Sequence, residues 1–185
     1  MNKKNEVQVL NDMIKSIKLG NEISFEKRKK KVPLAIPSYG YEEIIEVVDS
    51  LISSQITMGK KVKQFENEFA KYIGTKYAIM VNSGSSANLL ALSILSNPKL
   101  ENPIKPGDEI IVPAVCWSTT ISPIVQIGAI PVVVDVELDS FNIDQTKIKE
   151  SISSKTKAIM PVHLLGRPCN MDAIIKIANS NELYV

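Results

Sequence analysis

The chain has 185 residues, 44% of them hydrophobic and 23% charged, and a formal net charge of +2. This composition predicts one soluble folded domain with a sizeable core and argues against a disordered protein. Basic residues are spread along the chain except in the run over residues 27–31, so a nucleic-acid-binding surface is not indicated. The two cysteines lie far apart and predict neither a disulfide framework nor a metal site. With no long apolar run and no signal-peptide pattern, we expect a cytoplasmic protein without a membrane partner.

Residues 1–31 are expected to form an appended segment, a helix followed by a basic linker, ahead of a domain over residues 32–185. Apolar side chains in that segment recur at helical spacing, at Val7, Leu10, Ile14 and Ile17. Two amphipathic helices are predicted next, over residues 41–53 and 62–74, the second ending at Gly74 as its C-cap.

From residue 76 onward, short apolar runs rich in β-branched residues alternate with helical stretches. The runs predict buried strands over residues 77–81, 109–113, 130–136, 158–165 and 183–185. The stretches between them predict crossover helices over residues 85–95, 119–128, 144–153 and 171–181, with Pro123 shortening or kinking the second. The fold class is therefore α/β, a mainly parallel sheet flanked by helices. Because the last strand begins only at residue 183, we expect the chain to be the front part of a longer polypeptide.

Residues 82–86, "NSGSS", stand between a predicted strand and a predicted helix. A helix N-terminus offers unpaired N–H groups and a positive dipole end, and serine hydroxyls add donors, so this loop suits a phosphate group. The alternative is that Ser83 or Ser85 only caps the helix. The loop is neither a Walker motif nor a dinucleotide-binding turn.

The order and spacing of several motifs resemble the DegT/DnrJ/EryC1/StrS family of sugar aminotransferases over residues 33–185. The motifs are "TMGKKVKQFENEFAKYIG", "MVNSGSSANLLAL", "KPGDEIIVPAVCWSTT" and "TKAIMPVHLLGRPCNMDAI". The resemblance implies part of the large domain of a fold type I enzyme that depends on pyridoxal 5'-phosphate (PLP). It also implies a homodimer that acts on nucleotide-linked keto-sugars with an amino acid, expected to be glutamate, as amino donor.

The resemblance assigns Gly84, Ser85 and Ser86 to the PLP phosphate and places Trp117 against the pyridine ring. Without it, Trp117 would equally suit a core or interface. Gly59 and His163 are assigned to the substrate side of the site. The alternatives are a turn glycine at position 59 and a hydrogen-bonded structural histidine at position 163.

No catalytic residue is assigned, because the motifs for the Schiff-base lysine and the pyridine-binding aspartate are expected beyond Val185. The predicted function is amino transfer to a nucleotide-linked keto-sugar in polysaccharide or lipopolysaccharide sugar biosynthesis. A second interpretation is the family branch that removes the 3-hydroxyl of a 4-keto-6-deoxy sugar, in which histidine replaces the lysine and PLP works with an iron–sulfur partner. A third is a non-catalytic fragment or partner-dependent binding module.

Overall fold

The computed structural model describes residues 3–17 and 38–185, which form two compact units, Met1–Met80 and Val81–Val185. The predicted domain boundary near residue 31 and the basic run over residues 27–31 lie outside the described residues.

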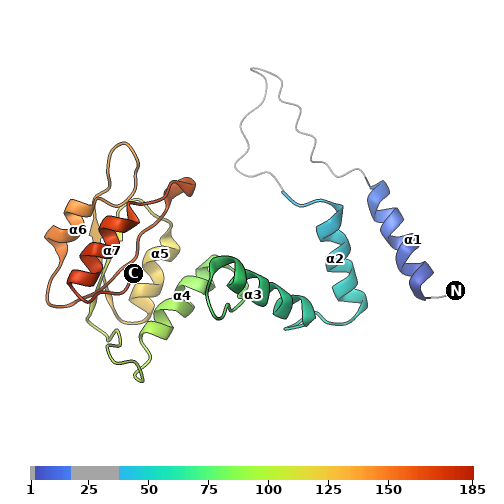
Figure 1. The fold of residues 1–185 in the computed structure, drawn as a ribbon, viewed down its shortest axis with the longest axis horizontal. Coiled ribbons are helices and arrows are strands. Elements are labelled where there is room, and N and C mark those ends of the chain that lie inside the picture. The colour runs from blue at the N-terminus through green and yellow to red at the C-terminus, as the bar shows by residue number, and fades with distance from the viewer. Residues whose placement is uncertain (1–2, 18–37) are drawn as a thin grey trace, which may run out of the picture. The chain divides into compact units, whose positions relative to one another are not determined.

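The first unit is helical and contains α1 (Lys3–Ser16), α2 (Tyr41–Ile52) and α3 (Lys60–Ile73) (Figure 1). All three helices were predicted from apolar spacing. α3 ends as expected at Gly74, whose left-handed backbone (φ 81°) lets its N–H donate to the carbonyl oxygen of Ala70 at 3.0 Å. At the start of α2, the Glu43 carboxylate accepts the N–H of Gly40, and this bond lowers the pKa of Glu43.

The strand predicted over residues 77–81 is not formed, so this prediction is wrong for the described structure. Tyr77 is 75% exposed and Ile79 is also exposed. The N–H of Met80 donates to the side chain of Glu66 at 2.9 Å rather than to another strand. An apolar run becomes a strand only where a neighbouring strand satisfies its N–H and C=O groups, which the run by itself cannot specify.

The second unit is built on a parallel sheet of three strands in the order β2-β1-β3. The strands are β1 (Glu109–Pro113), β2 (Ile130–Val134) and β3 (Thr156–Ile159). β1 agrees with its prediction, β2 covers the first part of its predicted run, and β3 includes only the beginning of its run. The run at residues 183–185 makes one parallel bridge, in which Ile159 N–H donates to the Tyr184 carbonyl oxygen at 2.9 Å.

Helices cover both faces of this sheet. Successive side chains of β1 point to opposite faces, and those on each face are buried against helices. The helices are α4 (Gly84–Leu95), α5 (Ser118–Gln126), α6 (Gln145–Ser151) and α7 (Met171–Ser180) (Figure 1). Ile111 packs in one buried cluster with Ile148 of α6 and Ile174 of α7. Ile110 and Val112 pack in the other, with residues of α4 and α5. The predicted α/β fold, a parallel sheet flanked by helices, is confirmed.

The helix with the internal proline, α5, continues past Pro123 to Gln126. Pro123 is buried and has no N–H, so the carbonyl oxygen of Thr119, four residues earlier, lacks its intrahelical donor. Within the described residues, no helix is long and apolar enough to cross a bilayer.

Candidate active site

The carboxyl ends of β1 and β3 form a topological switch point in the sheet. The chain leaves β1 through α5 to β2 on one side, whereas it leaves β3 through α7 to the bridge at Tyr184 on the other. In open parallel sheets, ligands bind where neighbouring strands send their connections in opposite directions. Trp117 follows β1 and His163 follows β3, so two of the predicted site residues flank this point.

Ser83 is the N-cap of α4. Its backbone is extended, its Oγ accepts the N–H of Ser86 at 3.2 Å, and its hydroxyl donates to the Ser86 Oγ at 3.2 Å. The capping alternative therefore holds for Ser83 but not for Ser85, which is the second residue of the helix. The amide of Ser86 is engaged by this cap, which leaves the first-turn amides of Gly84 and Ser85 as those directed beyond the helix end.

A cavity of ≈ 190 Å³ lies between the first two turns of α4 and the length of α5. Its lining residues carry mostly hydroxyl or amide groups, and they are Ser85, Ser86, Leu89, Thr119, Ser122, Pro123 and Gln126. The first turn of α4 holds no acidic residue, so the positive end of its dipole is not neutralised. This donor set fits a phosphate group.

Gly84 adds to the fit. A Cβ placed at this position would meet no atom within 4 Å, so the packing of the described chain does not require glycine here. The missing side chain leaves the helix end open to a ligand.

Thr119, Ser122 and Gln126 form the α5 wall of the cavity and were not predicted as site residues. A signal was present for Thr119 and Ser122, because "WSTTIS" places hydroxyl groups at the start of α5, as "NSGSS" places them at the start of α4. What the sequence could not show is that these two helix starts lie side by side.

Trp117 is the N-cap residue of α5, and its side chain is 76% exposed. It is therefore not a core residue of the described chain, and its indole is accessible at the carboxyl edge of the sheet. Beside it, burial raises the pKa of the Cys116 thiol.

His163 is exposed, and its Nδ1 accepts the N–H of Cys169 at 3.0 Å. In the neutral ring the proton then resides on Nε2. The hydrogen-bonded interpretation of His163 thus has direct support, while its exposed position still lets Nε2 donate to a ligand. Cys169 is buried, its Sγ donates to the carbonyl oxygen of Val162 at 3.1 Å, and burial raises the pKa of its thiol.

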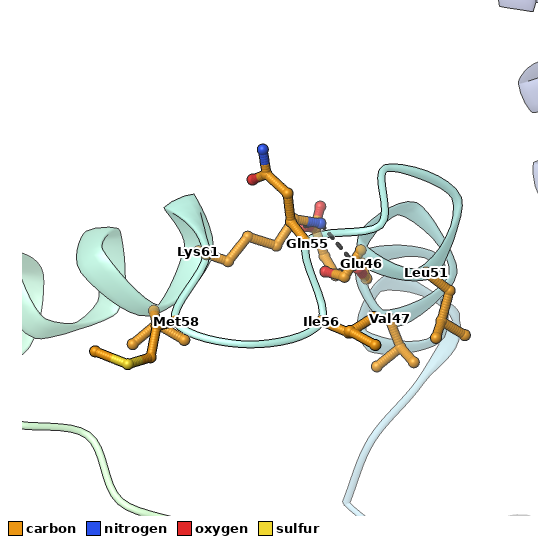
Figure 2. Close-up of a pocket in the computed structure, with 10 residues that line it drawn as sticks. Glu46, Val47, Leu51, Gln55, Ile56, Met58 and Lys61 are labelled. Atoms are coloured by element: carbon orange, nitrogen blue, oxygen red, sulfur yellow. Dashed lines mark hydrogen bonds and ion pairs between the residues drawn. The ribbon is translucent and has the colours of Figure 1, made fainter.

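Gly59 belongs to the helical unit, where it is the N-cap residue of α3. A Cβ there would come within 3.0 Å of the Gln55 carbonyl oxygen, so local packing alone accounts for glycine. Gly59 also lines a hollow of ≈ 380 Å³ between α2 and α3. Figure 2 shows Val47, Leu51 and Ile56 lying close together in its wall.

Lys61 forms the polar side of the same hollow. It makes ion pairs with Glu46 and with Asp49, and the hydrogen bonds that its ammonium donates to Asp49 first, and then to Glu46, raise the pKa of Lys61. Across the part of the chain that the structure describes, no group of three or more His, Cys, Asp or Glu side chains could hold a metal ion.

The sheet topology and the hydroxyl-lined cavity beside the start of α4 define an α/β domain whose donor set fits an anionic ligand. The model of the DegT/DnrJ/EryC1/StrS aminotransferase family matches residues 37–185, and the chain belongs to this family. The family prediction and the predicted fold type I large domain are thereby confirmed.

Relatives in this family carry two kinds of name. The chain is 44% identical over 153 residues to a GDP-4-keto-6-deoxy-D-mannose 3-dehydratase of Yersinia pseudotuberculosis, a match that covers 83% of this chain and 39% of the relative. The E. coli GDP-4-keto-6-deoxy-D-mannose-3-dehydratase, solved with bound hydrated PLP, superposes with a TM-score of 0.77 at 45% identity and covers 83% of this chain and 39% of that one.

A putative sugar aminotransferase of Streptococcus pneumoniae, solved in its PMP form, superposes with a TM-score of 0.74 at 36% identity. That match covers 82% of this chain and 37% of the other. The chain thus spans about two fifths of the length of the relatives it matches.

Proposed function

We propose that this chain forms the phosphate-holding part of a PLP-dependent enzyme that acts on a nucleotide-linked keto-sugar in polysaccharide or lipopolysaccharide sugar biosynthesis. The observation that carries the proposal is the hydroxyl-lined cavity of ≈ 190 Å³ at the first turn of α4. When bound, PLP supplies an electron sink for carbanion chemistry, and the protein supplies its binding and orientation.

Each predicted site residue has a role in this proposal. The Ser85 and Ser86 hydroxyls and the backbone amides of Gly84 and Ser85 bind the phosphate, and Gly84 leaves room for it. The exposed indole of Trp117 stacks on the ring, to which it contributes dispersion and offset stacking. On the substrate side, His163 offers the Nε2 proton and Gly59 shapes the hollow between α2 and α3.

The reaction proposed first is amino transfer from an amino acid, glutamate in the simplest case, to the keto carbon of the sugar. Removal of the 3-hydroxyl of a 4-keto-6-deoxy sugar is the second candidate. It draws support from the solved dehydratase, whose 45% identity exceeds the 36% of the sugar aminotransferase. We further propose that the enzyme works as a cytoplasmic homodimer, which light scattering after size-exclusion chromatography would test.

The test uses the complete polypeptide in which these residues occur. PLP binding is measured by absorbance titration, and the protein is then incubated with a nucleotide-linked 4-keto-6-deoxy sugar and glutamate. A sugar product that has gained nitrogen supports amino transfer, and one that has lost a hydroxyl oxygen supports dehydration. PLP binding without either product would support the non-catalytic binding module. Failure to bind PLP would refute the proposed function.

A further inference from the structure

A hydrogen bond joins α4 to α5 at the Thr119 carbonyl oxygen, the backbone group whose usual helix donor is missing at Pro123. The Thr119 carbonyl oxygen lacks the usual helix donor, because proline at the position four residues later carries no N–H. The side-chain amide of Asn88, on α4, donates to this oxygen at 3.1 Å in a partly buried environment. A carbonyl in such a place is costly to leave without a partner.

This hydrogen bond lies within the walls of the phosphate-fitting cavity. On α4, Asn88 lies between Ser85 and Leu89 in the sequence, and both of these residues line the cavity. On α5, Thr119 and Pro123 also line it. The bond therefore joins the two walls that carry the hydroxyl donors.

A second anchor between the same helices lies deeper in the unit. Leu92, one turn further along α4, is buried in the cluster that contains Ile124 of α5. Apolar packing at Leu92 holds α4 on the sheet but permits small rotations, whereas the directional bond at Asn88 sets the position of the first turn. The two helices are therefore joined at two positions along α4.

We propose that Asn88 is a positioning residue that, through the Thr119 carbonyl, holds the first turn of α4 at the separation from α5 that phosphate binding requires. The proposal rests on the proposed function, since it concerns the same phosphate. Asn88 itself touches neither phosphate nor substrate. It replaces the helix hydrogen bond that Pro123 removes and directs that bond across the cavity wall.

The test is a double-mutant cycle with Asn88→Ala and Pro123→Ala in the complete polypeptide, measured by titration with PLP and with pyridoxal. Asn88→Ala raises the Kd for PLP about three- to tenfold and leaves that for pyridoxal, which lacks the phosphate, nearly unchanged. Pro123→Ala restores a backbone N–H that can donate to Thr119, so Asn88→Ala costs less PLP affinity in that background.

The outcomes separate this inference from the proposed function. A lower unfolding temperature for Asn88→Ala with an unchanged ratio of PLP to pyridoxal affinity would make Asn88 a purely structural residue and overturn the inference. An equal loss in both backgrounds would overturn the role of Thr119. A wild-type protein that does not bind PLP would overturn the proposed function together with this inference. If Asn88→Ala does not fold, Asn88→Leu, which keeps the shape and removes the donor, takes its place in the cycle.

Discussion

Replacing Ser85 by alanine tests the phosphate site directly. Ser85 lies in the first turn of α4, its side chain is exposed, and its hydroxyl lines the cavity, while the helix cap is made by Ser83. The change should therefore alter the free energy of unfolding by no more than about 0.5 kcal/mol. A hydrogen bond to a charged group contributes about 1.5–3 kcal/mol, so the Kd for PLP should rise about 10- to 150-fold.

The matched control is Ser85→Thr, which keeps the hydroxyl and should keep most of the PLP affinity. Both variants are compared with the wild type by absorbance titration with PLP and with pyridoxal, and by thermal unfolding. Ser85→Ala should weaken PLP binding far more than pyridoxal binding, because only PLP carries the phosphate. An unchanged Kd for PLP in Ser85→Ala, with normal unfolding, would refute the assignment of this loop to the phosphate.

Three further measurements examine the cap, the core and the thiols. Ser83→Ala should lower the free energy of unfolding by about 1 kcal/mol, because the Ser86 N–H loses its capping acceptor. Ser83→Asp should keep the stability but weaken PLP binding, since its carboxylate repels the phosphate. Equal PLP affinity in the wild type and in Ser83→Asp would argue against a nearby phosphate. Ile124→Ala should cost about 2–5 kcal/mol in chemical denaturation, because Ile124 is 0% exposed; a cost below that of a surface substitution would contradict the packing. Iodoacetamide should label the partly exposed Cys116 before the buried Cys169, which peptide masses measured over time would show. Both thiols should react slowly at neutral pH, because burial raises the pKa of each. Labelling in the reverse order would contradict the burial of Cys169.

Local signals in the sequence were sufficient for the helices and for the main strands. The apolar spacing in α2 and α3, the glycine cap at Gly74 and the β-branched runs of β1 and β2 are properties of neighbouring residues, which act through backbone geometry within one element. The α/β fold followed from the order of these same elements, and the observed sheet confirms it. The family resemblance rested on the sequence motifs, and the family match confirms it.

The sequence did not specify which elements pair with one another. The run at residues 77–81 has the composition of a strand but pairs with none, because strand formation depends on a neighbour that composition does not name. The sequence also left Ser83 and Ser85 as equal candidates for the cap. Backbone geometry at the start of α4 assigns that cap to Ser83.

The sequence by itself determined the helices, the three paired strands, the family and the hydroxyl-rich loop at the start of α4. Only the tertiary structure decided the strand order β2-β1-β3, the cavity shared by α4 and α5, and the bond from Asn88 to Thr119. The physical reason is distance along the chain. A helix or a cap forms among residues a few positions apart, whereas the phosphate-fitting walls join residues more than thirty positions apart, which meet only when both helices pack on the same face of the sheet.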